Sequence, residues 1–210
     1  IIKEKEAEIH KVQQQLHQLA IEIHQNRLKV IPSLSAQLEQ ILQQLGMPNA
    51  QFQIVLNLLE TFSSNGKDEI TWLFSANKGS NLGELKKVAS GGEMSRIMLA
   101  IKSVLSKYTK LPTIIFDEID TGISGEVANK MAEIMQQMAA NMQVITITHL
   151  PQIAAKGAHQ FKVFKMDELD ITKTQIRKLS KEERIEELAE MLGGKSISAS
   201  AIEHAKQLLS

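Results

Sequence analysis

Two apolar stretches in the middle of the chain, residues 113–116 and 144–148, constrain its fold more than any other feature. Neither alternates with polar residues, which is typical of strands buried on both faces. Apolar residues at helical spacing precede the first stretch and separate it from the second. Because buried strands that alternate with helices form parallel sheets covered on both faces, the sequence predicts an α/β lobe. The two helices would carry Met94, Ile97, Met98, Ile101 and Leu105, and Val127, Met131, Ile134, Met135 and Met138.

The N-terminal segment has a different pattern, an apolar seam of seven-residue period. The seam consists of Ile2, Ile9, Leu16, Ile23 and Val30, with Val12 and Leu19 at the second seam position. This spacing predicts one arm of an antiparallel coiled coil. The alternative is an amphipathic helix packed on its own domain. Pro32 should kink or restart the helix, which then stops at Gly46-Met47-Pro48.

We therefore expect two domains, a coiled-coil arm segment over residues 1–45 and a larger lobe over 46–210. A β-hairpin over residues 52–74, with its turn within 63–68, should open the larger lobe. Later strands are expected near 161–165 and 172–177. Two helices should end the chain, and Ser198 is the predicted N-cap of the last one.

Composition sets limits on function. Lys and Arg together number 24, and Asp and Glu together also number 24. The chain therefore has no overall excess of positive charge for binding DNA phosphates. The absence of cysteine excludes disulfides and thiolate metal sites, and no run of about eighteen apolar residues could cross a membrane. Because residue 1 is Ile and the chain opens directly into a helical pattern, we interpret it as a fragment of a longer protein.

Three groups of residues can carry chemistry. Ser90-Gly91-Gly92-Glu93 stands at a helix start, where backbone amides and the helix dipole favour phosphate, although Ser-Gly-Gly is also a common turn. Asp117 and Glu118 end the first buried strand, where one carboxylate can hold Mg²⁺ and its neighbour can activate water. The alternative is a pair of solvated acids. His149 ends the second strand at the same edge of the sheet.

The other histidines favour simpler interpretations. His10, His17 and His24 repeat every seven residues and indicate a solvated stripe, too widely spaced to share one metal ion. His159 and His204 are expected to be ordinary surface or core residues.

The order and spacing of the three groups resemble the ATP-binding-cassette ATPases. Ser90 to Glu93 resembles the signature motif of that family, and Ile114 to Asp117 resembles its Walker B strand, with Glu118 in the catalytic position. Residues 119–125 resemble its D-loop, and His149 matches its switch histidine. The longer stretches 87–100, 115–125 and 146–155 resemble SMC-like heads of a bacterial DNA-repair branch, and this likeness extends over nearly the whole chain.

The resemblance implies a shared ATP site. Ser90, Gly91, Gly92 and Glu93 would contact the nucleotide of a second head, whereas Asp117 would hold Mg²⁺ and Glu118 would activate water for the chain's own ATP. His149 would contact the γ-phosphate, and Asp120, Gly122 and Ser124 would belong to the D-loop. Ser124 stands where SMC heads usually have aspartate.

The resemblance also implies partners: an N-terminal half of the same protein, a second copy of the head in a homodimer, and DNA. It implies DNA double-strand break repair in the cytoplasm, near the nucleoid, with no membrane. The chain contains no G-x-x-x-x-G-K-[ST] loop, because Ala189 stands where Gly193-Gly194-Lys195-Ser196 would need its first glycine. We expect Gly193-Gly194 to end a helix, and the chain alone to bind ATP poorly.

Two other functions remain open. A transporter ATPase subunit is disfavoured by the coil before the signature motif and by Glu93, where such subunits usually have glutamine. In a non-catalytic scaffold, Asp117 and Glu118 would be structural.

Overall fold

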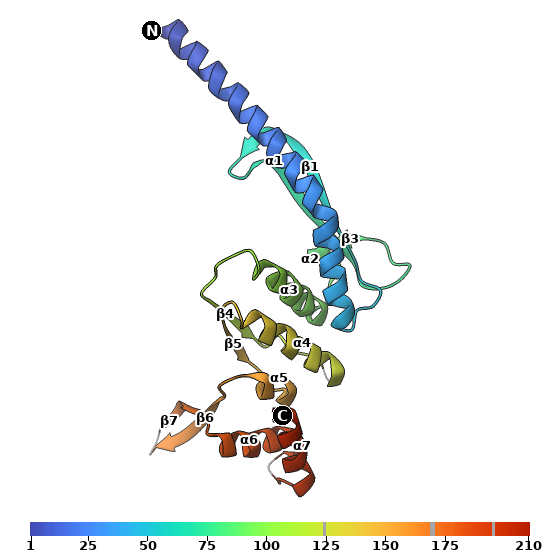
Figure 1. The fold of residues 1–210 in the computed structure, drawn as a ribbon, viewed down its shortest axis with the longest axis vertical. Helices are drawn as coiled ribbons and strands as arrows, with labels where there is room; N and C mark the ends of the chain where they lie inside the picture. The colour runs from blue at the N-terminus through green and yellow to red at the C-terminus, as the bar shows by residue number, and fades with distance from the viewer. Residues whose placement is uncertain (124, 169–170, 195) are drawn as a thin grey trace. The chain divides into compact units, whose positions relative to one another are not determined.

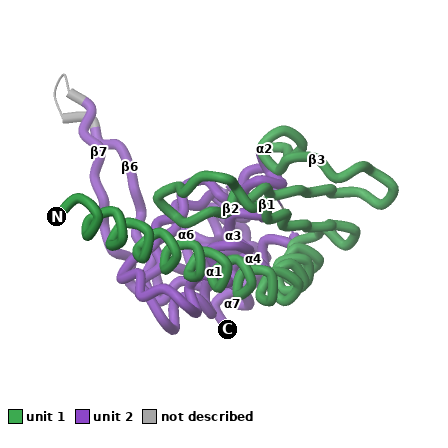
Figure 2. The backbone as a smooth tube through the Cα atoms, turned by 90° about the horizontal axis from the view of Figure 1, so that it is seen from above, with its two compact units in different colours: residues 1–90 green, residues 91–210 purple. Residues whose placement is uncertain are grey.

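The computed structural model describes residues 1–123, 125–168, 171–194 and 196–210. Its contacts separate two compact units, Ile1–Ser90 and Gly91–Ser210 (Figures 1 and 2). Each unit is considered by itself below. The unit boundary falls at Ser90 rather than after residue 45, so the division into an arm and a head lobe remains a prediction.

Unit 1 begins with one long helix, α1 (Ile2–Gln44), which continues through Pro32. The expected restart at Pro32 is wrong, because the helix continues although proline cannot donate a backbone hydrogen bond, and a kink there remains a prediction. The helix ends as predicted at Leu45, followed by Gly46 with φ +77°. A residue without Cβ adopts that left-handed conformation at little cost, which favours glycine there.

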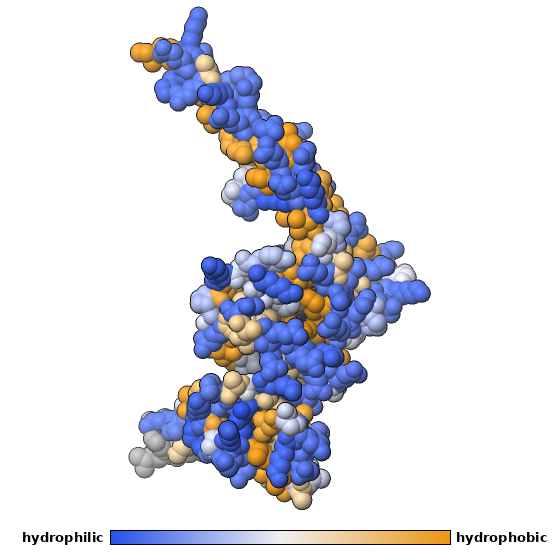
Figure 3. Space-filling view, viewed as in Figure 1, coloured by the Kyte–Doolittle hydropathy of each residue, from blue (hydrophilic) through white to orange (hydrophobic). Residues whose placement is uncertain are grey.

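The apolar seam of α1 remains exposed. Ile9, Leu16, Ile23 and Val30 are between 41% and 59% exposed, and Figure 3 shows apolar patches along this helix. Ala20, Leu38 and Leu42 are instead buried. Because buried and seam residues occupy different positions along the helix, the seam stays accessible to a partner helix, and the coiled coil remains a prediction.

The predicted hairpin is present as β1 (Gln51–Ser63) and β2 (Gly66–Ser75), paired antiparallel. Its register places Phe52 opposite Phe74 and Ile54 opposite Trp72. The Phe52 and Trp72 rings meet edge to face with centroids 5.3 Å apart, a favourable aromatic geometry. A short third strand, β3 (Gly83–Glu84), and a one-turn helix, α2 (Leu85–Val88), lie where the sequence indicated only a loop.

The far end of the hairpin is attached to α1 by a buried carboxylate. Asp68, whose side chain is 1% exposed, accepts from Arg27 Nη1 at 2.7 Å and lies 2.5 Å from His24 Nδ1. His17 packs edge-on against Phe62, with ring centroids 5.3 Å apart. The histidine stripe is therefore not simply solvated as expected, because two of its members contact the hairpin.

Unit 2 contains the predicted parallel pair. Strand β4 (Thr113–Asp117) follows α3 (Gly91–Leu105), and β5 (Gln143–Ile147) follows α4 (Gly125–Met138). The strands pair in parallel with Ile115 opposite Ile145, which confirms the α/β class. The helices bury only some of the residues that the helical spacing selected, namely Ile97, Met131, Ile134, Met135 and Met138, whereas Met98 and Leu105 are 40% and 41% exposed.

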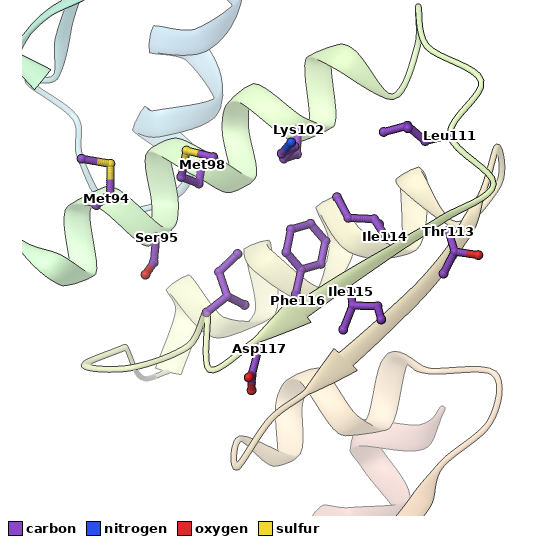
Figure 4. A pocket seen from close by; sticks show the side chains of 11 residues that line it. Met94, Ser95, Met98, Lys102, Leu111, Thr113, Ile114, Ile115, Phe116 and Asp117 are labelled. Carbon is purple, nitrogen blue, oxygen red and sulfur yellow. The ribbon is translucent and has the colours of Figure 1, made fainter. Parts of the chain in front are cut away.

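One face of this sheet is not covered. Ile115 is 63% exposed, Ile145 42% and Ile147 55%. In Figure 4, Ile114 and Phe116 lie on the side of β4 toward α3, and Ile115 and Asp117 lie on the opposite side. The prediction that helices cover both faces of the sheet is therefore wrong for this chain. The unbroken apolar sequences of β4 and β5 are nevertheless typical of strands that are buried on both faces.

The C-terminal part of unit 2 consists of a hairpin and three helices, of which α5 also contacts α4. The hairpin of β6 (Phe161–Glu168) and β7 (Ile171–Lys178) pairs antiparallel, and the helices are α5 (Pro151–Lys156), α6 (Lys181–Gly193) and α7 (Ala199–Leu209). The three helices share a core of small and aliphatic side chains, among them Ala155, Leu188 and Ala205.

Local signals set the ends of α6 and α7. Ser180 and Glu183 form a reciprocal capping box at the start of α6. Ser198 Oγ accepts from the Ala201 amide at 3.1 Å, which confirms the predicted N-cap. Gly194, with φ +75°, follows the last turn of α6, so Gly193-Gly194 ends a helix as expected.

Candidate functional site

The Ser-Gly-Gly motif stands at the N-terminal end of α3. Gly91 and Gly92 form its first turn, and the boundary between the two units falls between Ser90 and Gly91. The first amides of a helix have no partner within the helix, so they can point at an anion. A Cβ placed on Gly92 would lie 3.6 Å from the Thr121 carbonyl oxygen. The start of α3 therefore lies beside the loop that follows β4.

Asp117 and Glu118 are both exposed at the carboxyl end of β4. Among the described residues, Glu118 is the one non-glycine residue with positive φ, at +48°. Thr121 holds this turn, because its hydroxyl and amide donate to the Glu118 carbonyl at 3.0 and 3.4 Å. Backbone strain of this kind is concentrated at functional sites, which directs attention to the residue that the sequence selected as catalytic.

Asp120 is completely buried and connects the two strand ends. Its Oδ2 accepts from the Thr148 hydroxyl and, at 3.3 Å, from the His149 amide. His149 Nδ1 lies 3.5 Å from the same oxygen, while the imidazole remains 67% exposed. Sequence reasoning assigned Asp120 only to the D-loop and missed this link. The available signal was a single acid in a five-residue segment that begins with Ile119 and ends with Ile123.

The remaining D-loop residues shape the turn after β4. Gly122 has φ +73°, and the Ile123 amide donates to the Asp120 carbonyl at 3.2 Å. Ile119 and Ile123 are buried and anchor the loop. Ser124, the fourth predicted D-loop position, lies outside the described residues.

An open cleft between α3 and β4 has a volume of about 540 Å³ (Figure 4). Most of its lining is apolar, with Met94, Met98, Leu111 and Phe116 among its residues. Asp117 and Lys102 also line it, whereas the glycine motif, Glu118 and His149 do not. An apolar cleft is unsuited to a triphosphate, so we do not assign the nucleotide to it.

A metal site made by this chain alone and a membrane-spanning helix both find no support in the part of the chain that the structure describes. Over these residues, no group of three or more His, Cys, Asp or Glu side chains could hold a metal ion by itself. Nor does any helix of these ranges have the length and apolarity needed to cross a membrane. Asp117 and the adjacent Glu118 are exposed carboxylates without a third such ligand among the described residues.

The fold is that of an SMC-type head lobe, in which a long helix and an antiparallel hairpin precede a small parallel sheet. The Smc head domain of Pyrococcus furiosus, solved with an extended coiled coil and bound to the C-terminal domain of ScpA, aligns with TM-score 0.63 at 20% identity. That alignment covers 89% of this chain and 44% of the Pyrococcus chain. A chain from a study of ATP-driven dimerization and DNA-stimulated activation of SMC ATPases aligns with TM-score 0.53 at 19% identity, over 82% of this chain and 99% of that one.

At the level of sequence, the chain is a homologue of the DNA repair protein RecN. It is 39% identical to RecN of Haemophilus influenzae over 93% of its own length and 42% identical to RecN of Rickettsia conorii over 94%. It spans only 35% and 36% of those two relatives. A scan of protein-family models finds no match.

Proposed function

We propose that the chain is the C-terminal half of an SMC-like ATPase head that acts in DNA double-strand break repair and recombination. One observation carries the proposal: β4 and β5 are parallel neighbours whose carboxyl ends bring Asp117, Glu118 and His149 to one edge of the sheet. Ligands of parallel α/β sheets bind at that edge. The RecN relatives and the SMC-type fold support the same assignment.

Each residue at this edge would have one role. Glu118 would orient and deprotonate the attacking water, and His149 would contact the γ-phosphate of ATP. Asp117 would hold Mg²⁺, which neutralises developing phosphate charge when bound. Ser90, Gly91, Gly92 and Glu93 would contact the nucleotide of a second head, with Asp120, Gly122 and Ser124 forming the D-loop beside them.

An N-terminal half of the same protein would complete the sheet. Two strands with open edges and the exposed residues Ile115, Ile145 and Ile147 do not bury their apolar surface. Parallel strands are rarely stable unless both faces are covered. The missing half would cover this face and supply the phosphate-binding loop, consistent with a chain that spans about a third of its relatives.

A second copy of the head and DNA are the further partners. The structurally similar SMC ATPase has been studied for ATP-driven dimerization and DNA-stimulated activation, and we extend both properties to this protein. The chain would act in the cytoplasm, near the nucleoid. The transporter alternative has no comparable support, since the relatives are DNA repair proteins.

The test is ATP turnover by the chain mixed with its complementary N-terminal half, with and without DNA. Glu118→Gln keeps the shape of the side chain but removes the base, so turnover should fall by at least about a hundredfold. Glu126→Gln, an exposed change in the first turn of α4, is the matched control and should leave turnover unchanged. Turnover indifferent to Glu118→Gln would contradict the proposal, and a folded mixture without turnover would favour the scaffold.

A further inference from the structure

The cluster of Asp120, Thr148 and His149 contains a buried charge whose role is not explained by folding. Asp120 is 0% exposed, and its neighbours Ile119 and Ile123 are buried apolar residues. Only Oδ2 is bonded, since Oδ1 has no hydrogen-bond partner within the described part of the chain. Burying a carboxylate costs several kcal/mol unless donors compensate, so such a poorly paired acid contributes little to stability.

Both side-chain hydrogen bonds of Asp120 lead to the segment that carries His149. The Thr148 hydroxyl donates to Oδ2 and accepts from the Leu150 amide at 3.0 Å, and the His149 amide donates to Oδ2 at 3.3 Å. Thr148 and His149 thus donate to a carboxylate that belongs to the loop after β4, and Leu150 is connected to it only through Thr148. This contact spans 29 positions of sequence and makes the two strand-end loops one structural unit.

We propose that Asp120 is the positioning residue for the His149 imidazole, which it holds through Nδ1. Nδ1 lies 3.5 Å from Oδ2, just beyond hydrogen-bond length, so a small ring rotation closes the contact. A carboxylate beside one ring nitrogen draws the proton to that nitrogen and fixes the tautomer. Nε2, across the ring from Nδ1, is then the nitrogen that remains available for a ligand.

The tautomer of His149 would affect how this residue contacts ATP, and this consequence rests on the proposed function. A neutral imidazole with its proton on Nδ1 presents a lone pair at Nε2. When a phosphate oxygen approaches, Nε2 of this exposed ring can take up a proton from solvent, which gives an imidazolium that donates to Asp120 through Nδ1 and to the phosphate through Nε2. Asp120 therefore prepares His149 to bind an anion, although it would not touch the nucleotide itself.

The tautomer of His149 is measured directly in the 210-residue chain by nitrogen NMR of ¹⁵N-labelled histidine rings. The chain has six histidines, and a His149→Gln variant assigns the signal of interest. A neutral imidazole carries its one ring proton on either Nδ1 or Nε2, and in a free imidazole Nε2 is favoured. We expect neutral His149 to carry its proton mainly on Nδ1 instead, and the exposed His159 to carry its proton mainly on Nε2.

The variant that removes the charge is Asp120→Asn, which is nearly isosteric. The ratio of His149 tautomers should shift toward Nε2–H by about tenfold, the effect of one charge-assisted hydrogen bond. Glu126→Gln, an exposed change in the same unit, should leave the ratio unchanged. A purely structural role for Asp120 predicts no such shift in a folded variant.

Two results would overturn the proposal. One is Nε2–H as the main tautomer of His149 in the native chain, which needs no variant and holds even if Asp120→Asn fails to fold. The other is an unchanged tautomer in folded Asp120→Asn. Because the experiment uses neither ATP nor a second half, its failure leaves the turnover test of Glu118→Gln intact. Absence of turnover likewise leaves the tautomer result standing.

Discussion

Among the described residues, Asp68 in unit 1 and Asp120 in unit 2 both have buried side chains, and the two are paired very differently. Asp68 in unit 1, 1% exposed at its side chain, is met on one oxygen by His24 and on the other by Arg27. Asp120 in unit 2, also buried, has donors on Oδ2 alone. Burial raises the pKa of the Asp68 carboxyl, but the hydrogen bonds and positive charges of His24 and Arg27 outweigh it, so the pKa is lowered below its ordinary value.

This difference in pairing suggests different roles: Asp68 joins two elements of secondary structure, whereas Asp120 orients a residue of the candidate site. Asp68 connects the hairpin to α1, and its full set of partners makes removal of one partner costly. Asp120 connects two loops at the carboxyl ends of β4 and β5, where unpaired capacity remains. We therefore expect Asp68, with partners on both oxygens, to affect the free energy of unfolding. We expect Asp120, with donors on one oxygen, to affect the tautomer of His149.

The largest stability effect should come from an apolar residue of unit 2 rather than from either acid. Leu188 is fully buried in the core of α5, α6 and α7, so Leu188→Ala should cost about 2 to 5 kcal/mol of unfolding free energy. Chemical denaturation measures this, and amide exchange in α6 reports where it acts. Ile176→Ala, at a residue 69% exposed, is the control and should have little effect. Equal losses for both variants would refute this assignment of the core.

The next largest effect tests the connection between α1 and the hairpin. Asp68→Asn removes the charge that His24 and Arg27 share, and should cost about 1.5 to 3 kcal/mol, as for hydrogen bonds to charged groups. Glu69→Gln, at the exposed neighbouring position, should be nearly neutral. If Asp68→Asn leaves the free energy of unfolding unchanged, the proposed difference in role between Asp68 and Asp120 is wrong.

The pH dependence of unfolding sharpens the same contrast. Because the folded chain holds the Asp68 pKa below that of the unfolded chain, the stability it contributes is present above the unfolded pKa and is lost as pH falls through the folded value. Asp68→Asn should flatten this loss in acid, measured as unfolding free energy across that range. An unchanged acid profile would contradict the pairing.

The smallest effect concerns a local helix signal in unit 2. Ser198 caps α7 through its bond from the Ala201 amide, so Ser198→Ala should cost about 1 kcal/mol. Ser196→Ala, two residues earlier and outside the helix, should cost much less. Denaturation curves of the two variants provide the measurement, and indistinguishable curves would argue against the cap.

Features of short range were predictable from the sequence. The long N-terminal helix, the hairpin, the two parallel strands and the Ser198 cap follow from patterns within a few turns of chain. Pro32 misled the prediction because a penalty at one residue was outweighed by the rest of a 43-residue helix. The short elements β3 and α2 left no periodic signal, since two and four residues are too few to show one.

The sequence by itself determined which residue types end the two central strands, and with them the family that the chain resembles. Only the tertiary structure decided that Asp120 reaches His149, that His24 and Arg27 share Asp68, and that one sheet face remains exposed. The physical reason is distance along the chain. Periodicity and capping report interactions within a few residues, whereas these contacts join positions 29 to 44 residues apart. Packing alone selects such pairs.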